Sequence, residues 1–335
     1  MDALTSQISV STMSNRMKTL HIFGGGDFVG FAESVAVKYG WSVVVRTSKR
    51  FVHTIGSLHE DTKLLVGDSL DTLMKDGGFP QSGDIGLSFS APWIISPTII
   101  DLFNGDIYNL HNQPLPSYRG GGGLSWNILM GDSFGGTCVH KLTSKIDAGD
   151  IVARRDFSFP NSFEFPNEFQ KFTTNQAFSM LSDWLPVLLQ DGLTGQPSTN
   201  DCSKSEYWPR LNTEIHGWID WSWGLEDIQK FCNAFSYPQS GAKTYVNGRV
   251  LQILKVSINR SRPYHPYQLG LVFKILNDDL YVAHPDGFLC VHVYNTVDSS
   301  ARIRLGDRLF TPREVLERAM STRVQYLPSG EIKIQ

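Results

Sequence analysis

The sequence predicts an α/β domain followed by a smaller, mainly β domain. The chain has 335 residues, which suggests two domains with separate cores at roughly 150 residues per domain. Short apolar segments alternate with helical patterns up to about residue 150, whereas strand-like segments follow one another in the last third of the chain. A polar loop at 194–204 separates the two regions, so we expect domains at 17–205 and 206–335. Residues 1–16 have six Ser or Thr and little apolar periodicity, which is typical of a disordered tail.

The first domain is expected to begin with a strand, a glycine turn and a helix. The strand is expected at 18–23, and the glycine turn at 24–30 leads into a helical pattern. A dinucleotide site would need an acidic residue for the ribose after the second expected strand, 41–46, and none is present. The glycine turn is therefore expected to serve packing or to border a substrate rather than to bind a nicotinamide cofactor. Further strands are expected at 63–66 and 84–89. The alternation of strands and helices predicts a parallel sheet.

The second domain is expected to contain consecutive strands with a short helix at each end. A long helix at 167–190 precedes it, and a helix at 225–235 opens it. Asp286-Gly287 is a typical hairpin turn, and Thr311-Pro-Arg-Glu314 has the pattern of a capping box at the start of the last helix. The expected strands are 242–245, 250–256, 271–275, 280–283 and 288–293. This arrangement fits a small barrel.

The composition excludes several classes of protein. Thirty Lys and Arg against 33 Asp and Glu give a net charge of -3, which argues against strong, general nucleic-acid binding. The apolar stretches are far shorter than the ~18 residues that span a bilayer, and no signal sequence opens the chain. We therefore expect a soluble, cytoplasmic protein without a membrane partner. The four cysteines form no Cys-x-x-Cys pair, which predicts reduced thiols and no zinc site.

The segment 107–123 carries the most chemical information. Asn109 and His111 lie two residues apart on an expected strand, so their side chains share one face. A four-glycine run at 120–123 follows, and Asp147 lies on a later glycine-containing turn. A carboxamide donor, an imidazole and a carboxylate suit acyl transfer. Each also has a plain alternative as a strand cap, a core histidine or an Asx turn.

Four motifs occur in an order that resembles the folate-dependent formyltransferases. They are Asn109-x-His111, Leu115-Pro-Ser-Tyr-Arg-Gly120, Gly131-Asp-x-x-Gly-Gly-Thr-x-x-His140 and Asp147-x-Gly-Asp-Ile-Val152. The family includes glycinamide ribonucleotide transformylase, methionyl-tRNA formyltransferase and the sugar N-formyltransferases, which act on nucleotide-linked amino sugars. The segments 217–221 and 231–248 look like the start of the second domain in the transfer-RNA and sugar enzymes, a domain that the purine-pathway enzyme lacks.

The resemblance implies a Rossmann-like formyltransferase domain, an OB-like C-terminal domain and 10-formyltetrahydrofolate as co-substrate, with no metal. It places the catalytic Asn, His and Asp of the family on Asn109, His111 and Asp147. The implied mechanism is direct transfer to a substrate amine. Asn109 and a protonated His111 would hydrogen-bond to the developing oxyanion, and Asp147 would adjust the histidine and help to move a proton.

Further residues are expected to contact the two substrates. The expected folate site comprises Phe89, Ser90, Ala91, Trp93, Ile94, Asp147 and Asp150. The expected acceptor site comprises Tyr118, Arg119, Gly120, Gly121, Trp208 and Tyr237. An ordinary loop between the sheet and a helix remains the alternative for 89–94, and Arg119 is expected to hold the loop or a phosphate rather than to take part in chemistry.

The favoured acceptor is a nucleotide-linked amino sugar, with a 4-amino group preferred and lipopolysaccharide O-antigen biosynthesis as the context. The transfer-RNA enzyme usually carries a basic insertion after the second strand and a positively charged second domain. At the position of the insertion, this chain has only the short basic cluster 46–50. Residues 206–335 contain 15 Lys and Arg against 13 Asp and Glu. Methionyl-tRNA and a small amine such as hydroxyornithine remain alternatives, and a homodimer is compatible with the sugar branch. The complete set of candidate catalytic residues argues against a binding module without activity.

Overall fold

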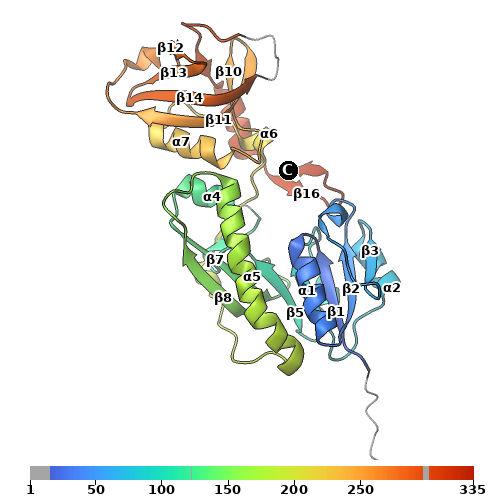
Figure 1. The fold of residues 1–335 in the computed structure, drawn as a ribbon. Helices are drawn as coiled ribbons and strands as arrows, with labels where there is room; N and C mark the ends of the chain where they lie inside the picture. The colour runs from blue at the N-terminus through green and yellow to red at the C-terminus, as the bar shows by residue number, and fades with distance from the viewer. Residues whose placement is uncertain (1–15, 122, 297–301) are drawn as a thin grey trace, which may run out of the picture.

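The structure is a computed structural model that describes residues 16–121, 123–296 and 302–335. Most of the expected tail, residues 1–15, lies outside the described residues, as does Gly122 of the glycine run. The chain forms an α/β lobe and a mainly β lobe, and its C-terminal end returns from the second lobe to the first (Figure 1). The predicted fold class is confirmed.

The α/β lobe is built on a seven-stranded sheet with the order β3-β2-β1-β4-β5-β7-β8. Its strands are β1 (Thr19–Gly24), β2 (Ser42–Thr47), β3 (Lys63–Val66), β4 (Ile85–Phe89), β5 (Ile107–His111), β7 (Phe134–Lys141) and β8 (Ile151–Ser158). The pairs from β3 to β5 are parallel, whereas β7 pairs antiparallel with both β5 and β8. The prediction of a parallel sheet is therefore wrong for β7 and β8, which follow one another through a short turn rather than a helical crossover.

Helices cover both faces of this sheet because residues of the inner strands alternate between them. Leu20 and Ile22 of β1 belong to the core beneath α1 and α5, whereas Phe23 packs with residues of α2 and α3. The helices of this lobe are α1 (Asp27–Lys38), α2 (Leu70–Gly77), α3 (Pro97–Asp101), α4 (Gly123–Met130) and α5 (Pro166–Asp191), with the 3-10 turn η1 (Val52–Thr54). The two cores thereby fix the C-terminal end of β5, which carries Asn109 and His111, at the edge of the sheet where the parallel strands end.

Arg46, the first residue of the expected basic cluster, is fully buried. Its Nε donates to the carbonyl of Leu73 at 3.1 Å, and Nη2 donates to the carbonyl of Gly78 at 2.8 Å. Its Nη1 donates to Nδ1 of His21 at 2.9 Å. The guanidinium thus satisfies carbonyls at the C-terminal end of α2 and adds no charge to the surface.

The mainly β lobe is a six-stranded antiparallel sheet with the order β12-β13-β14-β11-β10-β15. Its elements are α7 (Leu225–Ala234), β10 (Ala242–Val246), β11 (Arg249–Asn259), η3 (Pro266–Gln268), β12 (Val272–Leu276), β13 (Asp279–His284), β14 (Gly287–Thr296), β15 (Leu309–Phe310) and α8 (Arg313–Ser321). The sheet is a half-barrel, and one bridge between Leu271 and Arg308 joins the segments that precede its two edge strands. The expected hairpin forms between β13 and β14. The expected capping box is wrong, because the N-cap of α8 is Pro312, which has no side-chain donor or acceptor.

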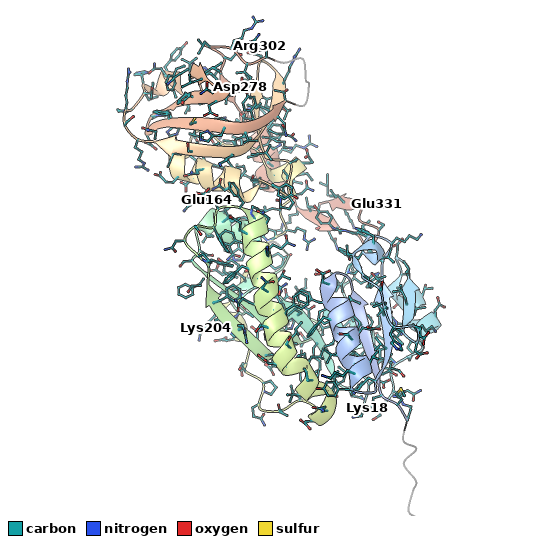
Figure 2. The ribbon with its side chains drawn as sticks, in the orientation of Figure 1. Lys18, Glu164, Lys204, Asp278, Arg302 and Glu331 are labelled. Atoms are coloured by element: carbon teal, nitrogen blue, oxygen red, sulfur yellow. The ribbon has the colours of Figure 1, made fainter. Side chains whose placement is uncertain are left out.

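A C-terminal hairpin, β16 (Val324–Tyr326) and β17 (Ile332–Ile334), extends from the β lobe towards the α/β lobe. Figure 2 shows Glu331 of this hairpin beside the α/β lobe. The remaining short elements of the described chain are β6 (Tyr118–Arg119), η2 (Cys202–Lys204), β9 (Glu206–Tyr207) and α6 (Thr213–His216). Within the residues described, no helix has both the length and the apolar character that crossing a membrane requires.

Candidate active site

The site forms where β5 ends beside β7. The antiparallel register places Asn109 opposite His140, and Nδ2 of Asn109 donates to Nε2 of His140 at 3.2 Å. Nδ1 of His140 donates to the carbonyl of Lys141 at 2.8 Å. This second bond leaves Nε2 of His140 as an acceptor and so fixes the orientation of the Asn109 amide. One Nδ2 hydrogen of Asn109 remains for another acceptor.

Asp147 reaches this edge of the sheet from the turn between β7 and β8. Its backbone has a positive φ of 47°, a conformation that Asp adopts more readily than most residues. The side chain of buried Asn200 donates from Nδ2 to the carbonyls of Asp147 at 2.9 Å and Gly149 at 3.1 Å. A contact from more than fifty residues away in the sequence therefore fixes the turn.

Gly149 is required by the close approach of two backbone segments. A Cβ atom at this position would lie 1.9 Å from the carbonyl oxygen of Lys141. We expect Gly149→Ala to lower the free energy of unfolding by about 2 kcal/mol or more, because the turn must move. Gly30→Ala is the matched control, since nothing lies within 4 Å of its Cβ position in α1. Urea denaturation measures both, and equal stability of the two variants would contradict the expectation.

Asp147 lies close to both histidines and to the loop that contains Tyr118, Gly120 and Gly121, which we call the glycine-rich loop. Its Oδ2 accepts a hydrogen bond from the Gly120 N–H at 2.9 Å and lies 3.8 Å from Nδ1 of His111. Its Oδ1 lies 3.5 Å from Nε2 of His140. The structure thus brings Asn109, His111 and Asp147 together, as the sequence predicted. It adds His140, which the sequence reasoning had noted only as part of a motif.

The two central groups are held in the neutral and the ionised form. Burial lowers the pKa of His111 to about 4, which outweighs the opposing charge of Asp147. Burial alone would raise the pKa of Asp147, but the two histidines and the Gly120 N–H together lower it to about 2. Nε2 of His111 donates to the carbonyl of Tyr118 at 2.7 Å, which leaves the lone pair on Nδ1. His111 is therefore neutral in the resting protein at neutral pH, and the protonated His111 that the resemblance implies at the developing oxyanion stays a prediction.

The low pKa of His111 predicts a pH-dependent stability. Between its unfolded pKa of 6.5 and its folded pKa of about 4, the unfolded chain binds a proton that the folded protein does not. The free energy of unfolding should therefore fall by about 2 kcal/mol for this group between pH 7 and pH 5. Urea denaturation at both pH values should show that His111→Asn removes this part of the loss. The same loss in the variant as in the wild type would contradict the assignment.

Most of the expected acceptor residues lie around the glycine-rich loop. The hydroxyl of Tyr118 donates to Asp132, and the ring of Trp208 packs against Trp126 with centroids 4.9 Å apart. The strand β6, which contains Tyr118 and Arg119, pairs with β9 and so places Trp208 beside Gly120. Tyr237 is 66% exposed and lies in the loop after α7, apart from this group.

A cleft of about 750 Å³ lies beside the loop that follows β4. Of the expected folate residues, Ser90, Ala91, Trp93 and Ile94 line it. Phe89 does not line it and is buried in the core with residues of α1 and α5, with 1% of its surface exposed. Asp147 and Asp150 do not line it, and the carbonyl of Asp150 accepts from the Lys141 N–H at 2.9 Å.

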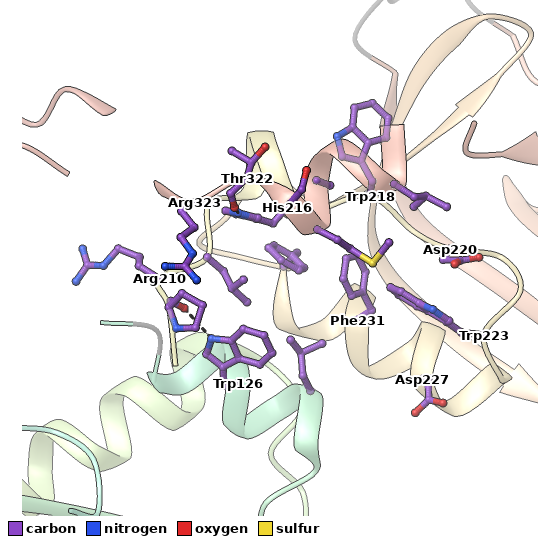
Figure 3. A pocket seen from close by; sticks show the side chains of 18 residues that line it. Trp126, Arg210, His216, Trp218, Asp220, Trp223, Asp227, Phe231, Thr322 and Arg323 are labelled. Atoms are coloured by element: carbon purple, nitrogen blue, oxygen red, sulfur yellow. Dashed lines mark hydrogen bonds between the residues drawn. The ribbon is translucent and has the colours of Figure 1, made fainter. Parts of the chain in front are cut away.

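A second cleft of about 740 Å³ lies between the two lobes (Figure 3). Trp126 of α4 contributes one side, and its Nε1 donates to the carbonyl of Pro209 at 2.8 Å. Trp218 and Trp223 of the β lobe also line the cleft, and Arg210 lines both clefts. The cleft is therefore aromatic, and its lining also includes two arginines and two carboxylates, Arg210, Arg323, Asp220 and Asp227.

A group of three potential metal ligands lies on β13 and β14 rather than at the active site. It comprises Asp279, Cys290 and His292, with Nδ1 of His292 3.0 Å from Oδ2 of Asp279. Across the described chain, no other such group occurs. The expectation of catalysis without a metal remains a prediction.

Comparison with protein families gives matches in both lobes. The formyl transferase family matches residues 91–159, and the formyl transferase C-terminal domain matches residues 213–298. The methionyl-tRNA formyltransferase of Agathobacter rectalis is 24% identical over 209 residues, which cover 62% of this chain and 65% of that protein. The bifunctional polymyxin resistance protein ArnA of Wigglesworthia glossinidia brevipalpis is 28% identical over 176 residues, covering 52% of this chain and 26% of that protein.

Solved structures share the fold at low sequence identity. An N-formyltransferase from Helicobacter canadensis, in complex with folinic acid and dTDP-3-aminofucose, has a TM-score of 0.61 and 16% identity, covering 82% of this chain and 99% of that one. A 4-N formyltransferase from Francisella tularensis has a TM-score of 0.57 and 13% identity, covering 71% of this chain and 97% of that one. The likeness extends across both lobes.

Proposed function

Because the chain belongs to the formyltransferase family, we propose that it transfers a formyl group from 10-formyltetrahydrofolate to an amine of a nucleotide-linked amino sugar. The observation that carries this proposal is the meeting of Asn109, His111 and Asp147 at the edge of the sheet. We favour a 4-amino group as the acceptor. The reaction would then take place in the cytoplasm and modify a sugar for lipopolysaccharide O-antigen.

The cleft beside β4 suits a flat, largely apolar ligand. Ala91, Trp93 and Ile94 line it, and Ile94 has 72% of its surface exposed although it is apolar. An exposed apolar side chain on a cleft wall favours a ligand that covers it. We propose that these residues hold the folate together with Ser90, and that 10-formyltetrahydrofolate supplies the activated formyl group there.

The protein groups then have separate roles in acyl transfer. The free Nδ2 hydrogen of Asn109 donates to the oxygen that gains negative charge as the acceptor nitrogen bonds to the formyl carbon. Nδ1 of His111 takes the proton that this nitrogen loses, and holds it for the nitrogen that leaves. Asp147, which is already ionised, stabilises the resulting imidazolium. His140 acts as a positioning residue because it orients the Asn109 amide.

Two features support a sugar acceptor over transfer RNA. Arg46 is buried, so the basic cluster after β2 has lost part of its surface charge. Trp126 and Trp223 line the cleft between the lobes, where a nucleotide base can stack on aromatic rings. Methionyl-tRNA is the second candidate, and the Agathobacter rectalis relative favours it.

Release of tetrahydrofolate from 10-formyltetrahydrofolate tests the acceptor. The panel contains dTDP-, UDP- and GDP-linked 3-amino and 4-amino sugars, methionyl initiator transfer RNA and hydroxyornithine. We expect turnover on one nucleotide sugar and none on the transfer RNA. Turnover on the transfer RNA or on hydroxyornithine alone would overturn the sugar proposal, and no turnover on any acceptor would overturn the enzymatic one. We further propose that the protein is a homodimer, and light scattering of the same preparation tests this.

A further inference from the structure

Two arginines from distant parts of the chain lie beside one tyrosine of the C-terminal hairpin. The guanidinium carbon of Arg50 is 4.9 Å from the ring centroid of Tyr326, and that of Arg210 is 5.3 Å from it. The hydroxyl of Tyr326 accepts from Nδ2 of Asn212 at 2.9 Å. Nε of Arg210 donates to the carbonyl of Gly121 at 3.2 Å. Stacking on Tyr326 therefore holds both guanidinium groups in place, and a hydrogen bond also holds that of Arg210.

Among the residues that the structure describes, no carboxylate forms an ion pair with either arginine. In the described parts of the chain, no carboxylate oxygen lies within 4.0 Å of either guanidinium, although Asp71 lines the same cleft. Desolvation, and then the charge of Arg50, lower the pKa of Arg210. Two cations held near one another repel, and a bound anion would remove this cost.

The arginines share their cleft with the apolar loop that follows β4. Both line the cleft of about 750 Å³ that also contains Ala91, Trp93 and Ile94. Arg210 also borders the cleft between the lobes, but Arg50 does not, so the pair acts together only beside this loop. The cleft thus combines a wall for a flat apolar body with two groups for an anionic end.

We propose that Arg50 and Arg210 bind the carboxylates of the folate glutamate tail, and that Tyr326 holds the two arginines in position. The planar guanidinium can form two parallel hydrogen bonds to a carboxylate. A chain of several glutamates carries more carboxylates, so the site should favour it. This inference rests on the proposed function. The three residues lie outside the segments 91–159 and 213–298 that match the family.

Isothermal titration calorimetry with 5-formyltetrahydrofolate tests the proposal on the full chain. We expect Arg50→Ala and Arg210→Ala each to weaken binding by about 10-fold, and the double variant to lose the preference for a triglutamate tail. Tyr326→Ala should weaken binding, whereas Tyr326→Phe should keep most of it. Lys49→Ala is the matched control, because Lys49 is exposed and does not line the cleft.

A ligand without the tail separates recognition from a structural role. The wild type and the double variant should bind 5-formyltetrahydropteroate, which lacks the glutamate, with equal affinity. Equal losses for both ligands would show that the arginines only support the fold and would overturn the inference. An unchanged folate affinity with weakened dTDP binding would also overturn it, because the anion would then be a nucleotide phosphate. If the wild type binds no folate, the proposed function itself fails.

Discussion

The Asp147→Asn variant is expected to lose about 10³-fold in kcat/KM while it binds folate with nearly wild-type affinity. The carboxylate is ionised at neutral pH because its pKa is about 2. It faces Nδ1 of His111 at 3.8 Å, where a positive charge develops only during proton transfer. An amide keeps the size of the group and can still accept from the Gly120 N–H, but it cannot neutralise the imidazolium. The loss should therefore affect the transition state rather than the bound substrate.

Steady-state tetrahydrofolate release and calorimetry with 5-formyltetrahydrofolate measure the two effects separately. Asp191→Asn is the matched control, because Asp191 is exposed at the end of α5. Circular dichroism melting checks that the variant is folded. A variant within tenfold of the wild type in kcat/KM would show that Asp147 does not have the proposed role.

The His111→Asn variant should lose about 10²- to 10⁴-fold in kcat/KM, the range for a general base. Asparagine keeps a polar group at the end of β5 but cannot take a proton from the acceptor amine. In the wild type, the acidic limb of the pH profile of kcat/KM should report a free-enzyme pKa near 4 rather than the ordinary 6.5. This limb should disappear in the variant.

The pH profile distinguishes a base from a residue that only supports the site. His53→Asn provides the control, because His53 is exposed in η1. The control should keep both the rate and the limb. If His111→Asn keeps the acidic limb at its wild-type pKa, another group is the base and the proposed mechanism is wrong.

The sequence predicts the inner strands because they are continuous apolar segments between helical patterns. β8 was not predicted, because its sequence is not a continuous apolar segment. Arg154, Arg155 and Asp156 interrupt the apolar pattern of this edge strand, and two of these side chains pair with each other. The sequences of β7 and β8 also do not show that these strands are antiparallel, because the direction depends on which strands they pair with in the folded sheet.

The catalytic candidates could be predicted where the evidence is local. Asn109 and His111 share a face because strand side chains alternate. The positioning role of His140 depends on its register opposite Asn109, which is a property of the folded sheet. Asn200 and Tyr326 contact the site region from distant parts of the chain. No periodicity or spacing connects such residues with the segments that they touch.

The atoms that hold His111 and Asp147 belong to the main chain of the glycine-rich loop. The Tyr118 carbonyl accepts from His111, and the Gly120 N–H donates to Asp147. The side chains of Tyr118 and Arg119 can therefore change without removing the main-chain bonds that orient the base and its partner. Evolution can exchange one acceptor amine for another by altering loop side chains, while the proton-transfer machinery is inherited intact. Engineering of acceptor range should accordingly begin with side-chain libraries at Tyr118 and Arg119 that keep the neighbouring glycines.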